Sequence, residues 1–186
     1  PNMTIIAPCD AQEMLRLMPK TVDWPNPIYI RLAKGGDRIV SRDDLDFEIG
    51  KAIILREPND GLFITTGVMT QKALEASEQL LAEGIECGVL HMHTIKPLDH
   101  AALEHLIPKV EAVITVEEHF RTGGLGSAVL ESCSDLIPEH VSKIARIGIP
   151  DQFVDKYGSQ ESLLEYLDIT IESIKNAMLA RLKKHN

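Results

Sequence analysis

The chain has 186 residues, a net charge of −9 and 44% hydrophobic residues, which is the range of an ordinary globular protein. The negative charge is spread along the sequence, which argues against binding to nucleic acid or to an anionic membrane, because both need clustered lysine and arginine. The longest apolar runs, such as residues 49–55, are far shorter than the roughly 18 residues of a membrane span, and the first residues do not resemble a signal peptide.

The first third of the chain reads as a strand, a helix and a second strand. We expect a strand at 3–8, a helix at 10–18 capped by Asp10, and a strand at 26–32. The next stretch, AKGGDRIVSRDDLDF at 33–47, follows neither the helical nor the strand period and carries two glycines. It is predicted to be a linker.

Strands and helices alternate after the linker. Residues 50–57 and 61–67 flank the turn sequence PNDG and are predicted to form a hairpin or two adjacent strands. The remaining predicted elements are a helix at 69–84, a strand at 85–93, a helix at 100–110 capped by Asp99, a strand at 111–118, a helix at 124–137, a strand at 141–149, and a mostly helical tail from Ser159 to Lys184 that breaks near 167–170.

This order predicts an α/β protein. Strands separated by helical stretches of ten or more residues imply parallel pairing, with crossover helices on both faces of the sheet. Residues 48–186 are therefore predicted to form one complete three-layer α/β domain, and residues 1–32 the last strand–helix–strand of a different domain.

Cysteine usage favours a reducing compartment. Cys9, Cys87 and Cys133 are odd in number, widely separated and form no CxxC pair. Reduced thiols of this kind are typical of cytoplasmic proteins, so we expect a cytoplasmic location and no disulfide framework. Cys9 precedes a predicted helix, where a thiol pKa can fall, but no partner base is identifiable and a structural role is favoured.

The stretch ITVEEHFRTGGLGSAVLE, at 114–131, resembles an active-site loop. A dinucleotide fingerprint fails here, because the sixth position counted from Gly124 is Val129 rather than glycine or alanine. The glycines could let a phosphate approach the N–H groups of the next helix, or let that helix pack closely on its strand, and close packing is favoured.

Glu117, Glu118 and His119 form the densest ionisable cluster, at the carboxyl end of a predicted parallel strand. A carboxylate beside an imidazole can do acid–base chemistry, but such a trio more often makes hydrogen bonds between domains. His91 and His93 would point to the same face of a strand and could share a metal. No third ligand is evident near them in the sequence, so no metal site is predicted.

Five motifs follow one another along the chain. They are IYIRLAKGG (28–36), TTGVMTQKALEASEQLLAEGI (65–85), HTIKPLD (93–99), VITVEEHFRTGGLGSAVLE (113–131) and RIGIPDQFVDKYGSQESLLE (146–165). In order and in spacing they resemble the C-terminal section of thiamine-diphosphate-dependent transketolases, especially the bacterial kind that is split into two polypeptides. The resemblance extends to deoxyxylulose-phosphate synthases and, more loosely, to beta subunits of 2-oxoacid dehydrogenase decarboxylases.

The resemblance implies that residues 1–32 are the tail of a pyrimidine-binding domain and that residues 48–186 are the transketolase C-terminal domain, a Rossmann-like layer without a cofactor of its own. It implies a structural junction or interface for six residues of the active-site-like stretch. They are Glu117, Glu118, His119, Gly123, Gly124 and Gly126.

The resemblance also bears on the cofactor. The complete enzyme would use thiamine diphosphate with Mg²⁺, but the family's GDG…N motif is absent, and KGGDR at 34–38 does not replace it. The activating glutamate of the family belongs to a part of the pyrimidine domain that would precede Pro1. We therefore expect no catalytic residue in this chain, and no thiamine diphosphate bound to it alone.

Arg31 is the one substrate contact that the resemblance carries over. On the residues alone, an arginine that ends an apolar strand beside glycines is a salt-bridge partner or an anion ligand. In transketolases and deoxyxylulose-phosphate synthases the corresponding arginine contacts the sugar phosphate.

The implied function is transfer of a two-carbon ketol unit between sugar phosphates. The implied partners are an N-terminal transketolase portion or subunit and further copies of the chain. The alternatives are a deoxyxylulose-phosphate synthase, a 2-oxoacid dehydrogenase decarboxylase beta subunit, and a non-catalytic α/β scaffold module.

Overall fold

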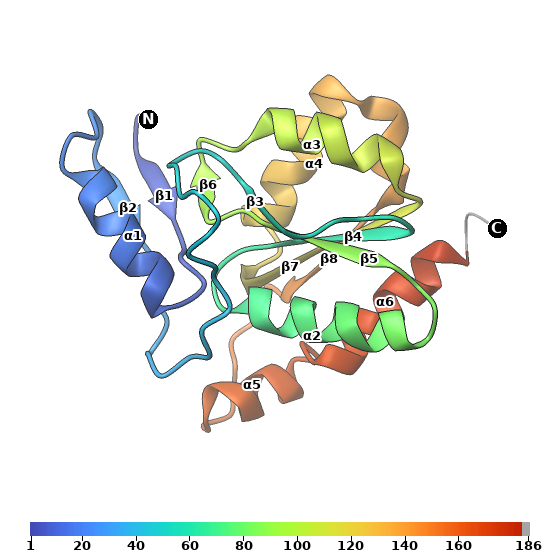
Figure 1. Ribbon diagram of the computed structural model, residues 1–186. Helices are drawn as coiled ribbons and strands as arrows, with labels where there is room; N and C mark the ends of the chain where they lie inside the picture. The colour runs from blue at the N-terminus through green and yellow to red at the C-terminus, as the bar shows by residue number, and fades with distance from the viewer. Residues whose placement is uncertain (184–186) are drawn as a thin grey trace.

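The computed structural model describes residues 1–183 and contains two sheets flanked by helices (Figure 1). The strands are β1 (Thr4–Ile6), β2 (Ile28–Ile30), β3 (Ile53–Arg56), β4 (Gly61–Thr65), β5 (Cys87–His91), β6 (Thr94–Lys96), β7 (Ala112–Phe120) and β8 (Ile144–Ile149). The helices are α1 (Ala11–Thr21), α2 (Met69–Ala82), α3 (His100–Leu106), α4 (Leu125–Leu136), α5 (Gln160–Tyr166) and α6 (Ile171–Leu182), with short 3₁₀ turns η1 (Ile107–Lys109) and η2 (Pro138–Lys143).

The larger sheet has the order β3-β5-β4-β7-β8. Strands β5, β4, β7 and β8 are parallel, and only the edge strand β3 is antiparallel to its neighbour. Helices α3 and α4 cover one face of this sheet, and α2 and α6 cover the other (Figure 1). The predicted three-layer α/β class with a mostly parallel sheet is confirmed.

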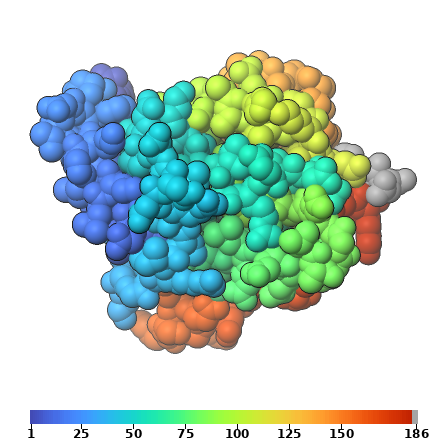
Figure 2. Space-filling model, in the orientation of Figure 1, coloured from blue at the N-terminus to red at the C-terminus, as the bar shows by residue number. Residues whose placement is uncertain are grey.

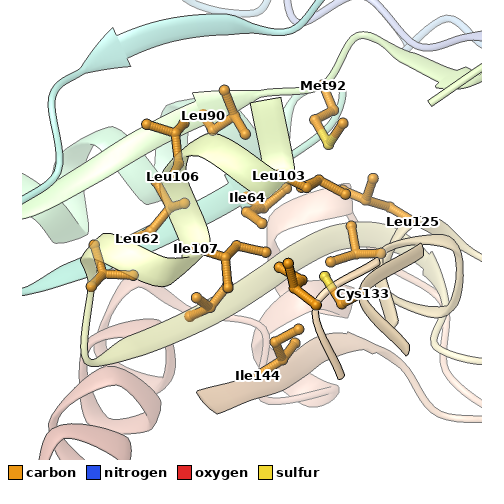
Figure 3. Close-up of a cluster of buried hydrophobic side chains, with 14 residues drawn as sticks. Leu62, Ile64, Leu90, Met92, Leu103, Leu106, Ile107, Leu125, Cys133 and Ile144 are labelled. Atoms are coloured by element: carbon orange, nitrogen blue, oxygen red, sulfur yellow. The ribbon is translucent and has the colours of Figure 1, made fainter. Parts of the chain in front are cut away.

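Each face of the larger sheet has its own apolar core. On the α3–α4 side, buried leucines and isoleucines of the strands interdigitate with those of the helices, as for Ile64, Leu103 and Leu125 (Figure 3). On the opposite side, Phe63 and Ile114 pack against α2 and α6. These continuous apolar strands are typical of a parallel sheet buried on both faces.

The predicted hairpin of residues 50–57 and 61–67 is wrong. Strands β3 and β4 are not neighbours, because β5 lies between them. The residues of the predicted turn instead contact the chain just before β5. The N–H groups of Asn59 and Asp60 both donate to the carbonyl of Glu86. The connection passes so close to β5 that a Cβ added at Gly88 would lie 2.6 Å from Pro58.

The smaller sheet has the order β2-β1-β6 and contains a strand that the sequence did not predict. Strand β6 belongs to the chain after the linker, yet it pairs antiparallel with β1, where Ile6 is opposite Thr94. The N–H of Ala7 also donates to the carbonyl of His93, at 2.8 Å. Residues 1–32 are thus joined by backbone hydrogen bonds to the rest of the chain, while the division into domains stays a prediction.

Residues 33–47 contain neither helix nor strand, as predicted, but they pack against the body of the molecule. The carboxylate of Asp10 holds this segment by accepting hydrogen bonds from the N–H groups of Val40 and Ser41, at 2.8 and 2.7 Å. At the end of the segment Phe47 stacks on the His93 ring. Figure 2 shows the segment, in light blue, lying against the blue N-terminal residues.

The helical tail breaks where the sequence predicted. Helix α5 ends at Tyr166, and Thr170 caps α6 through a capping box with Ser173. The predicted end at Lys184 lies outside the described residues. The three cysteines are unpaired and buried, and none of the helices in residues 1–183 combines the length and the apolar character needed to span a bilayer.

Candidate functional site

The candidate site lies at the carboxyl ends of the parallel strands β4 and β7. In an open α/β sheet this edge is where ligands usually bind. The residues after β4, the end of β7 and the residue after β2 meet there, and they surround two neighbouring cavities of about 330 and 160 Å³.

Arg31 lines both cavities. It follows β2 directly, and its backbone N–H donates to the carbonyl of Ile6, which fixes the position of its Cα. The guanidinium lies over Gly67, where an added Cβ would be 3.6 Å from Arg31 Nη2. None of the ion pairs formed within residues 1–183 involves Arg31. Its charge is therefore available to an anion in either cavity.

Glu117 lines the smaller cavity, but its carboxylate is hydrogen-bonded to the backbone. Its carboxylate accepts hydrogen bonds from the N–H groups of Leu125 at 2.6 Å and Gly126 at 2.8 Å, so it caps α4. Burial raises the pKa of Glu117, and the two N–H donors, with His119 and Arg31, oppose that rise without cancelling it. Two of the N–H groups at the N-terminus of α4 are therefore occupied by this carboxylate and not offered to a phosphate.

The glycines of the junction have distinct physical roles. Gly123 has a φ of +76°, which favours glycine. A Cβ on Gly124 would collide with the Glu117 carboxylate and lie 2.7 Å from the Phe120 carbonyl, and one on Gly126 would lie 2.6 Å from Thr115 Oγ1. The close-packing interpretation of these glycines therefore agrees with their contacts.

Glu118 contacts a different part of the molecule from Glu117, whereas His119 stays beside the Glu117 carboxylate, with Nδ1 at 4.0 Å from Glu117 Oε2. The Glu118 carboxylate lines the larger cavity and accepts hydrogen bonds from the Gln160 side chain at 2.7 and 2.8 Å. His119 is half-buried, and its Nδ1 also contacts the Phe120 carbonyl at 2.9 Å. The predicted role of the three residues at an interface stays a prediction.

A second polar cluster lies at the seam between α1 and the larger sheet. Glu13 and His91 are both buried, and Glu13 Oε2 lies 2.8 Å from His91 Nε2. Burial alone would raise the pKa of Glu13, but the charge and hydrogen bond of His91 outweigh it and lower that pKa to about 2. Glu13 was not predicted as a site residue, although its spacing from Leu17 places a carboxylate on the buried face of the helix.

The cluster also includes Cys9. His91 and His93, which were predicted to point to the same face of a strand, contact different partners. The backbone N–H of Cys9 donates to Glu13 Oε2 at 2.6 Å, and burial raises the pKa of the Cys9 thiol. His91 Nδ1 contacts Thr70 Oγ1 at 2.9 Å, whereas His93 Nδ1 contacts Thr94 Oγ1. Burial, followed by the charge of His91, lowers the pKa of His93 to about 4.

Comparison with known proteins shows to which family the chain belongs. Residues 50–174 match the family described as "Transketolase, C-terminal domain". A subunit of the apulose-4-phosphate transketolase of Phocaeicola vulgatus is 35% identical over 185 residues, which cover 99% of this chain and 58% of the relative. The 1-deoxy-D-xylulose-5-phosphate synthase of Caldanaerobacter subterraneus is 32% identical over 186 residues, which cover 99% of this chain and 29% of the relative.

A solved structure shows the same fold. A chain described as "Split gene transketolase, inactive beta4 tetramer" superposes with a TM-score of 0.91 at 35% identity, and the match covers 100% of this chain and 60% of that one. The chain therefore belongs to the transketolase C-terminal domain family. It spans about half the length of the first curated relatives that it matches.

The described residues do not suit the diphosphate and Mg²⁺ of the family's cofactor. Gly35 and Gly36 have positive φ values, but Asp37 next to them belongs to no group of three ligands. The one such group among residues 1–183 is Cys9, Glu13 and His91. Sulfur and imidazole are not the ligands that Mg²⁺ prefers. That this chain binds no thiamine diphosphate by itself stays a prediction.

Proposed function

We propose that this chain is the C-terminal part of a cytoplasmic transketolase, which transfers a two-carbon ketol unit between sugar phosphates. Thiamine diphosphate supplies the carbanion chemistry in the complete enzyme, and an N-terminal portion or subunit holds it with Mg²⁺. Two of the relatives are themselves single subunits of transketolases, and the similar solved structure is a tetramer. Both facts support partnership with an N-terminal portion and with further copies of the chain.

The observation that carries the substrate class is the position of Arg31. Its guanidinium lines two cavities at the carboxyl edge of the sheet, and no carboxylate of residues 1–183 neutralises it by an ion pair. A guanidinium donates two parallel hydrogen bonds to a phosphate, so Arg31 recognises the phosphate of the sugar. No group of this chain takes part in the chemical step.

The test is Arg31→Ala in the enzyme assembled with its N-terminal portion. Loss of a hydrogen bond to a charged group costs about 1.5–3 kcal/mol, so KM for a phosphorylated donor should rise about 10-fold or more. KM for hydroxypyruvate, which has no phosphate, should stay within about 2-fold. Arg42→Ala is the control, because Arg42 is exposed and pairs with Asp44 on its own segment.

Equal losses for both donors would contradict the phosphate role. Arg31→Lys separates the effect of charge from that of geometry. Lysine keeps the positive charge but cannot donate the two parallel hydrogen bonds of a guanidinium. The affinity for the phosphorylated donor should therefore lie between those of Arg31→Ala and the unmodified enzyme. An assembled enzyme that makes deoxyxylulose phosphate from pyruvate, and no transketolase product, would favour the synthase alternative.

A further inference from the structure

Three potential metal ligands converge at the seam between α1 and the larger sheet. Cys9 Sγ, a Glu13 carboxylate oxygen and a His91 ring nitrogen all lie within 4.8 Å of one another. They come from the turn before α1, from α1 itself and from the end of β5. All three side chains are excluded from solvent, with relative exposures of 0%, 0% and 1%.

The ligand types point to one class of ion. A thiolate, an imidazole and a carboxylate together suit a borderline-soft cation, and tetrahedral Zn²⁺ accepts all three. With bonds of about 2.0–2.3 Å, two ligands of a tetrahedral zinc ion are about 3.3–3.6 Å apart. The Glu13 Oε2 to His91 Nε2 distance of 2.8 Å is a hydrogen bond in this structure. An ion would widen that contact by about half an ångström.

Neighbouring hydroxyl groups already orient the imidazole. His91 Nδ1 contacts Thr70 Oγ1 at 2.9 Å, and Thr70 Oγ1 contacts Thr65 Oγ1 at 3.0 Å. A hydrogen bond at the second ring nitrogen fixes the ring and the tautomer of a metal-binding histidine. Here it leaves Nε2 facing Glu13 and Cys9.

An unpaired buried atom gives an independent sign that a ligand belongs here. Glu13 Oε1 is buried without a hydrogen-bond partner among residues 1–183. It belongs to the carboxylate whose Oε2 contacts His91 and the N–H of Cys9. A buried polar atom left unpaired destabilises a fold, and more so when it is charged, so a cation held by this carboxylate would offset that cost.

We propose that Cys9, Glu13 and His91 bind one Zn²⁺ ion. The ion would join the turn before α1 to the larger sheet. Binding releases the Cys9 proton and the proton at His91 Nε2 to solvent, and the proton on His91 Nδ1 is donated to Thr70 Oγ1. The proposal differs from the sequence-based prediction, which was that no metal site exists. That prediction considered His91 and His93 and did not place Cys9 and Glu13 near them.

The experiment measures zinc in the 186-residue chain and does not depend on its activity. The chain is unfolded with a chelator, refolded with one or more equivalents of Zn²⁺, desalted and analysed for metal by mass spectrometry. We expect one Zn²⁺ per chain and a higher melting temperature than without zinc. Refolding with Co²⁺ should give a thiolate-to-cobalt charge-transfer absorption, which reports the Cys9 bond.

Cys9→Ser and Cys87→Ser form a matched pair, because both remove a buried free thiol and only the first removes a proposed ligand. Cys9→Ser should lose the charge-transfer absorption and at least 10-fold in zinc affinity, while Cys87→Ser behaves as the unmodified chain. Circular dichroism checks that both variants fold. The proposal is overturned if the unmodified chain retains no zinc, or if Cys9→Ser retains as much as Cys87→Ser.

Discussion

Glu117 shows at the scale of one residue how a catalytic-looking carboxylate can be structural. It accepts hydrogen bonds from two backbone N–H groups at the start of α4, and a Gln at this position can accept only one of them favourably. We expect Glu117→Gln to lower the free energy of unfolding by about 1–3 kcal/mol, measured by urea denaturation at pH 7.

The same substitution gives a pH test with a definite sign. Burial raises the pKa of Glu117 above its ordinary value of 4.5, so the folded chain binds this proton more tightly than the unfolded chain. The stability of the unmodified chain relative to Glu117→Gln should therefore fall as pH rises from about 4.5 through the raised pKa, and level off above it. A difference that grows with pH over that window would mean that the N–H donors outweigh burial.

Some residues of the candidate site could be found from sequence and others could not. Arg31 and Glu117 were found because both come at the end of a strand, and strand ends meet at one edge of the sheet. Glu13 was missed because its partner His91 is 78 positions away in the sequence. A buried carboxylate of this kind becomes visible only when two distant segments are packed together.

At the scale of elements, the start of α4 depends on two adjacent glycines for different reasons. Gly124→Ala places a methyl group against the Glu117 carboxylate and the Phe120 carbonyl. We expect a loss of about 3 kcal/mol, from overpacking and a displaced cap together. Gly123→Ala meets no atom within 4 Å and suffers only from its φ of +76°, so it should lose about 1 kcal/mol.

Urea denaturation of the two alanine variants measures this difference directly. Equal losses would show that backbone strain, rather than close contact with Glu117, determines the sequence of the junction. The measurement therefore tests the close-packing interpretation of Gly124 without any assumption about substrate binding.

The order of the elements was predictable, and their pairing was not. Hydrophobic periodicity and capping residues such as Asp10 and Asp99 locate helices and strands, because these signals are local. The partner of a strand depends on the whole chain. Residues 94–96 escaped prediction because their partner β1 lies before the linker.

For the whole molecule, the question is whether residues 1–32 unfold with the rest of the chain or before it. Trp24 is the only tryptophan of the sequence. Its Nε1 donates to Thr4 Oγ1 at 2.8 Å, and its ring packs against a separate apolar cluster that includes Ile6 and Phe47. Tryptophan fluorescence therefore reports the N-terminal segment, while circular dichroism at 222 nm reports every helix.

We expect the two thermal transitions to coincide, because β6 pairs with β1 and Asp10 holds residues 33–47. A fluorescence transition that precedes the circular dichroism transition would instead support an independent unit at 1–32. In that case the linker would be a true domain boundary in the isolated chain.

The placement of β5 between β3 and β4 has a consequence for synthesis on the ribosome. The partner of Ile53 is His91, so β3 leaves the ribosome well before the strand that it must join. Because non-local strand pairs form slowly, β3 stays unpaired until α2 and β5 have emerged. The first strand of the larger sheet to be translated therefore waits for a partner that is translated only after β4 and α2.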